Sequence, residues 1–335
     1  MDLNVLWFIL ITVLFVGFFF LEGFDYGVGA LMPIVGKDDD ERRVALNTIG
    51  PFWDGNEVWL ITAGGAMFAA FPHVYATMFS GFYLALFLIL ICLILRATGI
   101  EFRSQKPSLA WRKKWDMVIA VSSLLSAVLW GVAVSNLVIG VPIDENMQYA
   151  GTFFTLLRPF CLLGGVMLTL IFLYHGACYM MLKVGEETVL NRVQKIADKI
   201  GPLMILVTVA WVVWAFFASN MFDSMIALVA VALAAVSMIL SVLFTKKRAS
   251  GKAFIFIGLA IAFCVVGVFA GMFPNIMIST IDPAYSLDIY NAASSPKTLS
   301  FMTKVALTLV PIVLAYQIWS FYVFRKRVTK SDVKY

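Results

Sequence analysis

The chain contains nine apolar segments, each close to the roughly 20 residues that a helix needs to cross the hydrocarbon core of a membrane. The sequence is 61% hydrophobic and only 13% charged, whereas soluble domains carry about 25% charged residues. It therefore predicts an all-α membrane protein that forms a single integral domain over residues 1–335. The nine expected transmembrane helices cover approximately residues 5–31, 51–71, 75–97, 116–139, 156–181, 202–220, 225–245, 253–274 and 301–324.

The basic residues are distributed unevenly between the loops. Of the 25 Lys and Arg residues, 22 lie after the first, third, fifth and seventh segments or in the C-terminal tail, if Arg96 at the end of the third segment is counted as a loop residue. Loops rich in Lys and Arg stay on the cytoplasmic side. We therefore expect the N-terminus outside and the C-terminus in the cytoplasm. This placement accounts for the net charge of +5 without a nucleic-acid partner.

Most connections between the segments are short, so consecutive helices are expected to be antiparallel neighbours in bundles. The longest connection on the outer side, roughly residues 275–300, is polar and contains Pro283 and Pro296. We expect it to pack over the outer face of the helices. Nothing in it resembles a soluble catalytic domain.

Four carboxylates stand out near the predicted cytoplasmic surface. Glu22 and Asp25 lie in the last third of the first segment, and Asp54 and Glu57 lie in the first two turns of the second. Each pair is spaced i, i+3, which places its members on one face of a helix. Because the two helices run in opposite directions, we expect all four carboxylates to meet at the same depth.

Three interpretations of these carboxylates remain open. They could be interfacial residues that cap helices and pair with Arg42 or Arg43. They could form a proton entry path, since carboxylates inside membranes commonly relay protons. They could also bind a cation, even two metal ions. Di-metal helical bundles of the ferritin type use Glu-x-x-His pairs, and this sequence has none.

Only two histidines, His73 and His175, occur in the chain. His73 lies at the outer end of the second segment, and His175 lies near the cytoplasmic end of the fifth. At opposite depths they cannot ligate one haem together, so the chain is not expected to hold several haems. Trp59, two turns into the second segment, either packs against a neighbouring helix or lines a narrow apolar passage.

Several motifs resemble subunit II of the cytochrome bd-type quinol oxidases. They are GFDYGVG at residues 23–29, ERR at 41–43, WDGNEVW at 53–59, FAAFP at 68–72 followed by Tyr75 and Ala76, GFY at 81–83, FRS at 102–104 and MFP at 272–274. The similarity covers essentially the whole chain, and residues 53–59 form its most specific block.

This resemblance implies two four-helix bundles plus one peripheral helix, and a heterodimer with a subunit I of the same fold. In the family, subunit I carries two b-type haems, haem d and the quinol site. The pair oxidises quinol, reduces dioxygen to water and takes protons from the cytoplasm without pumping. No cofactor is then expected on this chain alone. Lipids and quinones surround the complex, and the resemblance does not decide whether a small single-helix third subunit joins it.

The resemblance also assigns roles to individual residues. Asp54 matches the family aspartate that is thought to feed a proton path, and Asp25 matches a second acidic position beside it. Trp59 matches the tryptophan at the entrance of a proposed oxygen tunnel. Glu57 is a position where Gln also appears, so it and Glu22 are weaker members of the path.

We therefore expect the haem-free subunit of a bd-type oxidase in a bacterial cell membrane, with a cytoplasmic proton inlet. One alternative is a carboxylate-dependent secondary transporter with its site between the first two helices. Broken helices at the membrane midplane would favour that alternative, whereas the acidic residues lie near the inner surface. The other alternative is a purely structural assembly subunit.

Overall fold

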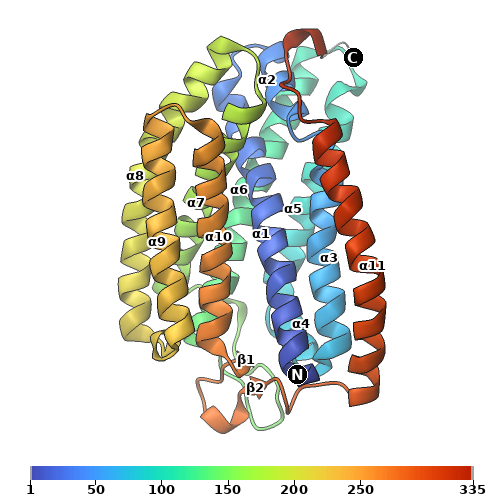
Figure 1. Ribbon diagram of the computed structural model, residues 1–335, viewed down its shortest axis with the longest axis vertical. Coiled ribbons are helices and arrows are strands. Elements are labelled where there is room, and N and C mark those ends of the chain that lie inside the picture. The colour runs from blue at the N-terminus through green and yellow to red at the C-terminus, as the bar shows by residue number, and fades with distance from the viewer. Residues whose placement is uncertain (1, 333–335) are drawn as a thin grey trace.

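The structure is a computed structural model that describes residues 2–332, and Figure 1 shows it as an elongated stack of roughly parallel and antiparallel helices. The N-terminus lies at one end and the C-terminal segment at the other. The helices are α1 (Leu3–Val35), α2 (Asp39–Asn47), α3 (Trp53–Ala70), α4 (Pro72–Gly81), α5 (Tyr83–Phe102), α6 (Leu109–Ile139), α7 (Pro159–Lys183), α8 (Glu187–Ala218), α9 (Met225–Lys246), α10 (Ser250–Met272) and α11 (Pro296–Val323).

Eight of the helices within residues 2–332 are long and apolar enough to cross a membrane: α1, α5, α6, α7, α8, α9, α10 and α11. The expected helix at residues 51–71 corresponds to α3, which is not among them. This helix has 18 residues, or about 27 Å at 1.5 Å per residue. Its first turns also contain Asp54, Asn56 and Glu57, which lower its mean hydropathy.

The observed boundaries differ from the predicted ones mainly where helices leave the membrane. The expected segment 75–97 is divided into α4 and α5, which meet at Phe82. Helix α8 begins at Glu187 instead of near residue 202, because a polar stretch continues the helix beyond the apolar part. The charged connection after α1 also contains a helix, α2. Its N-cap is Asp38, whose side chain accepts a hydrogen bond from the Glu41 amide at 2.8 Å, as N-cap aspartates do.

Helix α1 is the central element, because it packs against α3, α6, α7 and α10. It crosses α7 closely at the point where Gly27 faces Gly176. A Cβ atom added to Gly27 would overlap the backbone of α7 at Phe172, and one added to Gly176 would overlap the backbone of α1. Small residues allow helices in a membrane to approach this closely.

Two connections cover the end of the molecule where the chain begins. Strands β1 (Asn275–Met277) and β2 (Leu287–Asp288) form an antiparallel pair. The 141–152 connection joins this layer through a bridge between Val141 and Ser279. Met277 and Leu287 are fully buried beneath it. The connection therefore packs over this end of the helices, as expected; that this end is the outer face stays a prediction.

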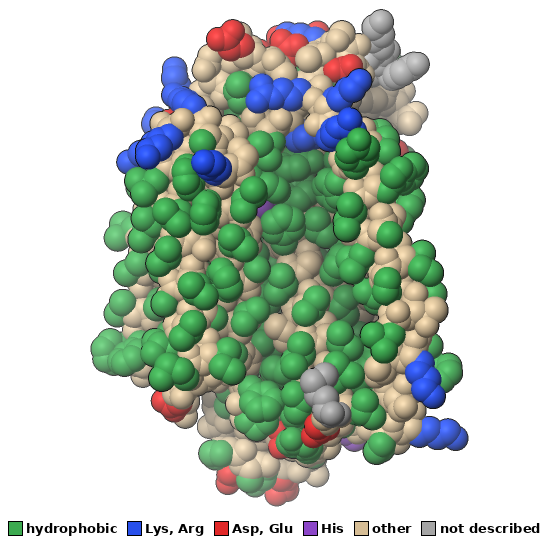
Figure 2. All heavy atoms as spheres, in the orientation of Figure 1, with side chains coloured by type: hydrophobic (Ala, Val, Ile, Leu, Met, Phe, Trp, Pro, Cys, Tyr) green, Lys and Arg blue, Asp and Glu red, His purple; other side chains and the backbone are tan. Residues whose placement is uncertain are grey.

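Ion pairs tie the opposite end together. Arg103 is fully buried and bonds Asp116 at 2.5 Å and Asp39 at 2.7 Å. A second pair joins Glu41 of α2 to Arg192 of α8 at 2.5 Å. Figure 2 shows that Lys and Arg gather at this end, whereas the sides of the molecule are largely hydrophobic. Lys and Arg side chains are therefore concentrated at this end, and Arg103 and Arg192 among them join its helices through ion pairs.

Helix α11 is peripheral. Among its residues only Leu299 is buried, and Figure 1 shows the helix running along the edge of the molecule beside α3. At its first turns, the Trp7 indole donates to the Leu299 carbonyl and to the Thr303 hydroxyl, both at 3.1 Å. At its other end, the Lys183 ammonium donates to the carbonyls of Phe324 and Lys326. The helix is thus fastened mainly at its two ends.

Candidate functional site

Three carboxylates surround one guanidinium group between α1, α3 and α5. The Arg96 guanidinium forms ion pairs with Glu22 and with Glu57, and the second of these is 2.5 Å long. The side chains of Arg96 and Glu22 are 1% and 0% exposed, and that of Glu57 is 21% exposed. The Arg96 Cζ atom also lies 4.7 Å from the ring centroid of Tyr26. We call Glu22, Asp25, Glu57 and Arg96 the acidic cluster.

Asp25 completes this cluster one turn after Glu22 and is itself fully buried. Its Oδ2 atom accepts a hydrogen bond of 2.8 Å from the Asn56 amide on α3. Its Oδ1 atom has no hydrogen-bond partner within residues 2–332. The i, i+3 spacing thus places Glu22 and Asp25 on the same side of α1, as the sequence predicted, and aims both at α3 and α5.

Asp54 does not join the cluster, so the expectation that all four carboxylates meet is wrong for this residue. It is exposed in the first turn of α3, and its Oδ1 atom accepts a 2.7 Å hydrogen bond from the neighbouring Gly55 amide. Asn56, two residues later, occupies the buried position that faces Asp25. The i, i+3 rule predicted a shared face, but at the start of this helix Glu57 turns toward Arg96 while Asp54 faces outward.

Pairing with Arg42 or Arg43, one of the three interpretations open from the sequence, is not observed for the four carboxylates within residues 2–332. Arg42 instead binds Asp116 at 3.2 Å. The cation of the cluster is Arg96, which is buried within α5 and does not lie in a loop. A signal for it existed: Leu95 and Ala97 flank Arg96 in an otherwise apolar stretch, and a charge in such a stretch needs a partner.

The two histidines lie on different helices, α4 and α7, and in different surroundings. His73 is exposed at the start of α4. His175 is buried, its Nε2 atom is bonded to the Phe20 carbonyl at 2.9 Å, and its ring stacks on Phe254 at 5.0 Å. Within residues 2–332 there is also no group of three or more His, Cys, Asp or Glu side chains that could hold a metal ion. The Nδ1 atom of His175 has no hydrogen-bond partner within these residues.

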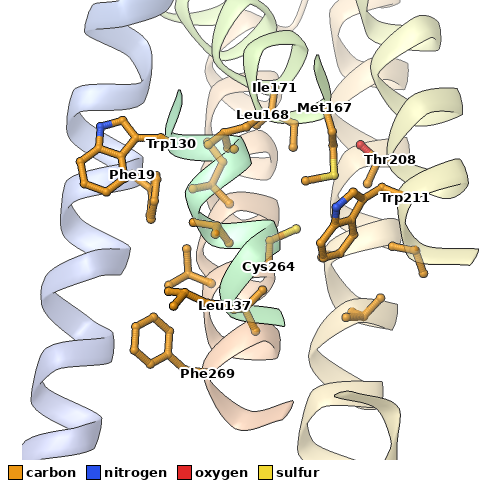
Figure 3. Close-up of a pocket in the computed structure, with 18 of the residues that line it drawn as sticks. Phe19, Trp130, Leu137, Met167, Leu168, Ile171, Thr208, Trp211, Cys264 and Phe269 are labelled. Carbon is orange, nitrogen blue, oxygen red and sulfur yellow. The ribbon is translucent and has the colours of Figure 1, made fainter. Parts of the chain in front are cut away.

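A separate apolar cavity of about 260 Å³ is lined by residues of α1 and of α3 to α10. Figure 3 shows Phe19 and Trp130 at one side of it and Thr208 and Trp211 at the other. Its lining is almost entirely hydrocarbon, ring and thioether surface, so water has little to bind there. None of the carboxylates of the acidic cluster, nor Trp59, lines this cavity.

Comparison with known sequences identifies the family. The profile described as "Cytochrome bd terminal oxidase subunit II" matches residues 3–324.

The chain belongs to the cytochrome bd terminal oxidase subunit II family.

Curated relatives match this subunit II chain over nearly its full length. Cytochrome bd ubiquinol oxidase subunit 2 of Bacillus subtilis (strain 168) is 41% identical over 334 residues, covering 99% of this chain and 98% of the relative. Cytochrome bd-I ubiquinol oxidase subunit 2 of Escherichia coli (strain K12) is 38% identical over 369 residues, covering 99% and 97%. With the eight apolar helices, this family membership makes the chain a multi-pass protein of the bacterial cytoplasmic membrane.

The fold is similar to that of a solved bd oxidase. A chain in the structure of bd oxidase from Geobacillus thermodenitrificans superposes with a TM-score of 0.73, covering 96% of this chain and 97% of that one. The identity between the two is 15%. The similarity therefore concerns the fold alone.

Proposed function

We propose that this chain is the haem-free subunit II of a bd-type terminal oxidase, in which quinol oxidation is coupled to the reduction of dioxygen to water. The haems and the quinol site would lie on a subunit I partner, and the complex would not pump protons. Two observations support this assignment. The relatives of the chain are subunits 2 of cytochrome bd ubiquinol oxidases, and within residues 2–332 no group of three or more His, Cys, Asp or Glu side chains could hold a metal ion.

The proposed role of the acidic cluster is a proton inlet from the cytoplasm. The carboxylates become less exposed in steps, from exposed Asp54 through half-buried Glu57 to fully buried Glu22 and Asp25. If all three carboxylates of the cluster were ionised, they would outnumber the single guanidinium of Arg96 inside the membrane, where uncompensated charge is costly. The cluster therefore has a physical reason to take up protons. This excess of carboxylates over cations is the observation that carries the proposal.

The proposal also includes which end of the molecule faces the cytoplasm and which helix would complete the set of nine membrane helices. The end that carries α2, the ion pairs and most Lys and Arg side chains would face the cytoplasm, because basic residues favour that side. Helix α3 lies between α1 and α11. It would cross the membrane as well, in addition to the eight apolar helices, and the partner would shield it from lipid. The nine helices would then form two four-helix bundles with α11 at the edge.

Subunit I would dock on the outward side of α3. Gly55, Gly64 and Gly65 on this helix have no atom within 4 Å of where a Cβ would be, and Ile61 and Phe68 are 71% and 59% exposed. Small residues of this kind allow a second helix to approach closely in a membrane. A partner here would also cover the side of the molecule to which Asp54 belongs.

The test is made on the complex purified gently from its native membrane. Reduced-minus-oxidised spectra should show haem bands that accompany a second large subunit. Asp25→Asn should then lower quinol-driven oxygen uptake by roughly 10²-fold, the lower range for a lost proton-transfer group, with the haem bands intact. Glu145→Gln, an exposed residue of an outer loop, is the matched control and should leave the rate unchanged.

Three other outcomes would contradict the proposal in different ways. A colourless chain that purifies without a haem-bearing partner would reject the oxidase and favour the transporter. Full oxygen uptake by both Asp25→Asn and Asp54→Asn would indicate that the chain is a purely structural assembly subunit. Loss of the haem bands in Asp25→Asn alone would show that the residue supports assembly instead of proton entry.

A further inference from the structure

A chain of three hydrogen bonds leads to Asp25 from the other side of α3 and passes through α11. The Trp59 indole Nε1 atom donates to Gln317 Oε1 at 2.9 Å. Gln317 Nε2 donates to Asn56 Oδ1 at 3.4 Å. Asn56 Nδ2 then donates to Asp25 Oδ2 at 2.8 Å. The chain therefore starts on α3, crosses to α11, returns to α3 and ends on α1.

The direction of these bonds is fixed by the first residue. An indole N–H can only donate, so the side-chain oxygen of Gln317 must face Trp59. The NH₂ group of Gln317 then faces Asn56, and this in turn requires the oxygen of Asn56 to face Gln317. The NH₂ group of Asn56 is left to point at Asp25. Each amide could otherwise rotate by 180° and present its oxygen instead.

We propose that Trp59, Gln317 and Asn56 form a directional relay that keeps a hydrogen-bond donor on the Asp25 carboxylate. Trp59 and Gln317 are positioning residues in this relay, because they act on Asp25 through Asn56. A donor to a carboxylate favours its charged form. The relay thereby sets how tightly Asp25 holds a proton, and this inference rests on the proposed role of the cluster as a proton inlet.

The packing around Gln317 agrees with such a role. It is half-buried, whereas Tyr316 and Ile318 beside it are 66% and 71% exposed. One turn later, Phe321 stacks on Phe52 with ring centroids 4.2 Å apart. Gln317 and Phe321 thus form the contact of this half of α11 with α3 and its N-cap residue Phe52. The position of this otherwise loosely packed helix is therefore coupled to Asp25.

The indole ring of Trp59 packs against α1 at a glycine. The ring of Trp59 lies directly against Gly17, where any Cβ atom would overlap its six-membered ring. A glycine at this position lets the indole approach α1 closely enough to turn its N–H toward α11. The relay gives Trp59 a polar role that does not depend on an oxygen passage.

Other titratable groups also act on Asp25, and the test must separate them from the relay. They are Glu22 on α1, Glu57 on α3, Arg96 on α5 and Tyr179 on α7, and Tyr26 of α1 lies against Arg96. None of them accepts or donates a hydrogen bond to Trp59, Gln317 or Asn56 within residues 2–332. Substitutions at Trp59 and Gln317 therefore leave these groups in place.

The experiment follows the carboxyl C=O infrared band of Asp25 in the intact complex as a function of pH. The band is identified by its loss in Asp25→Asn. In Gln317→Leu and in Trp59→Phe the midpoint of its titration should move to higher pH by about one unit, which corresponds to a tenfold tighter hold on the proton. Trp319→Phe, an indole of α11 that is 59% exposed, and Thr308→Val, whose hydroxyl bonds its own helix at Lys304, should leave the midpoint unchanged.

An unchanged midpoint in both Gln317→Leu and Trp59→Phe would overturn the relay. A shift in Trp59→Phe without one in Gln317→Leu would also overturn it, because the indole would then act without the amides. The proposed inlet is judged separately, by oxygen uptake in Asp25→Asn. If that rate is normal while the midpoints shift, the relay stands and the inlet fails. If the rate falls while the midpoints stay fixed, the inlet stands and the relay fails.

Discussion

Arg96 of α5 and Glu22 of α1 form an ion pair whose side chains are 1% and 0% exposed. The two residues are more than seventy positions apart in the sequence, and the pair joins their helices in a part of the chain surrounded by apolar side chains. Glu57 shares the same guanidinium at 2.5 Å. One cation thus holds together carboxylates from two different helices, and the geometry of the acidic cluster depends on it.

Replacing Arg96 by Met should destabilise the protein strongly. Removing one partner of a buried ion pair leaves the other charge uncompensated, which costs about 3–5 kcal/mol. Thermal unfolding of the purified complex, followed by tryptophan fluorescence, measures this loss. Arg325→Met, an exposed arginine near the end of the chain, is the control and should unfold at the wild-type temperature. Equal unfolding temperatures for the two variants would contradict the assigned role of Arg96.

Gly176→Ala should weaken the crossing of α1 and α7. The added methyl group would overlap the α1 backbone at Gly27, and overpacking of this kind costs about 1–3 kcal/mol. Gly251→Ala is the matched control, because that glycine lies in the first turn of α10 with open space around it. Unfolding temperatures measured side by side should fall only for Gly176→Ala. A fall of the same size in both variants would show that the crossing is not the cause.

Glu41 should make the stability of the folded protein depend on pH in the acidic range. The hydrogen bond from Arg192 lowers the pKa of Glu41 from 4.5 to about 2 despite its partial burial. A depressed pKa in the folded protein contributes stability above the unfolded-state pKa and loses it as pH falls through the folded-state pKa. The difference in unfolding temperature between wild type and Glu41→Gln should therefore be constant above about pH 5 and vanish near about pH 2.

Two further results would decide this prediction. Glu145→Gln, exposed in the loop between α6 and α7, should follow the wild-type curve throughout. A wild-type advantage over Glu41→Gln that persists unchanged to the lowest pH would mean that the bond to Arg192 contributes little to folding.

Lys183→Met should loosen the C-terminal tail. The Lys183 ammonium holds the carbonyls of Phe324 and Lys326, and beside it the Val328 amide donates to the Lys183 carbonyl at 2.7 Å. Amide hydrogen exchange at Val328 should become several-fold faster, as expected from a loss of about 1 kcal/mol. Lys330→Met removes only an exposed pair with Asp38, which is worth little. Exchange that is equally slow in both variants would contradict this anchor.

The sequence by itself determined the class of the protein and most of its helices. Apolar length fixes which segments can cross a membrane, because every backbone polar group there must be bonded within a helix. The spacing of Glu22 and Asp25 determined their common side of α1, since that relation is local. The observed limits of α8 and the presence of α2 were not predicted, because polar helices outside the membrane carry no hydropathy signal.

Only the tertiary structure decided which polar groups meet. Asp54 and Glu57 are three residues apart, yet one faces outward and the other reaches Arg96, because the placement of α5 decides which of them finds a cation. Gln317 lies more than 250 residues from Asn56 and Trp59, and no local pattern links them. Such partners are set by how the helices pack, since the cost of burying a polar group is met only by a group that the folded chain brings within hydrogen-bond distance.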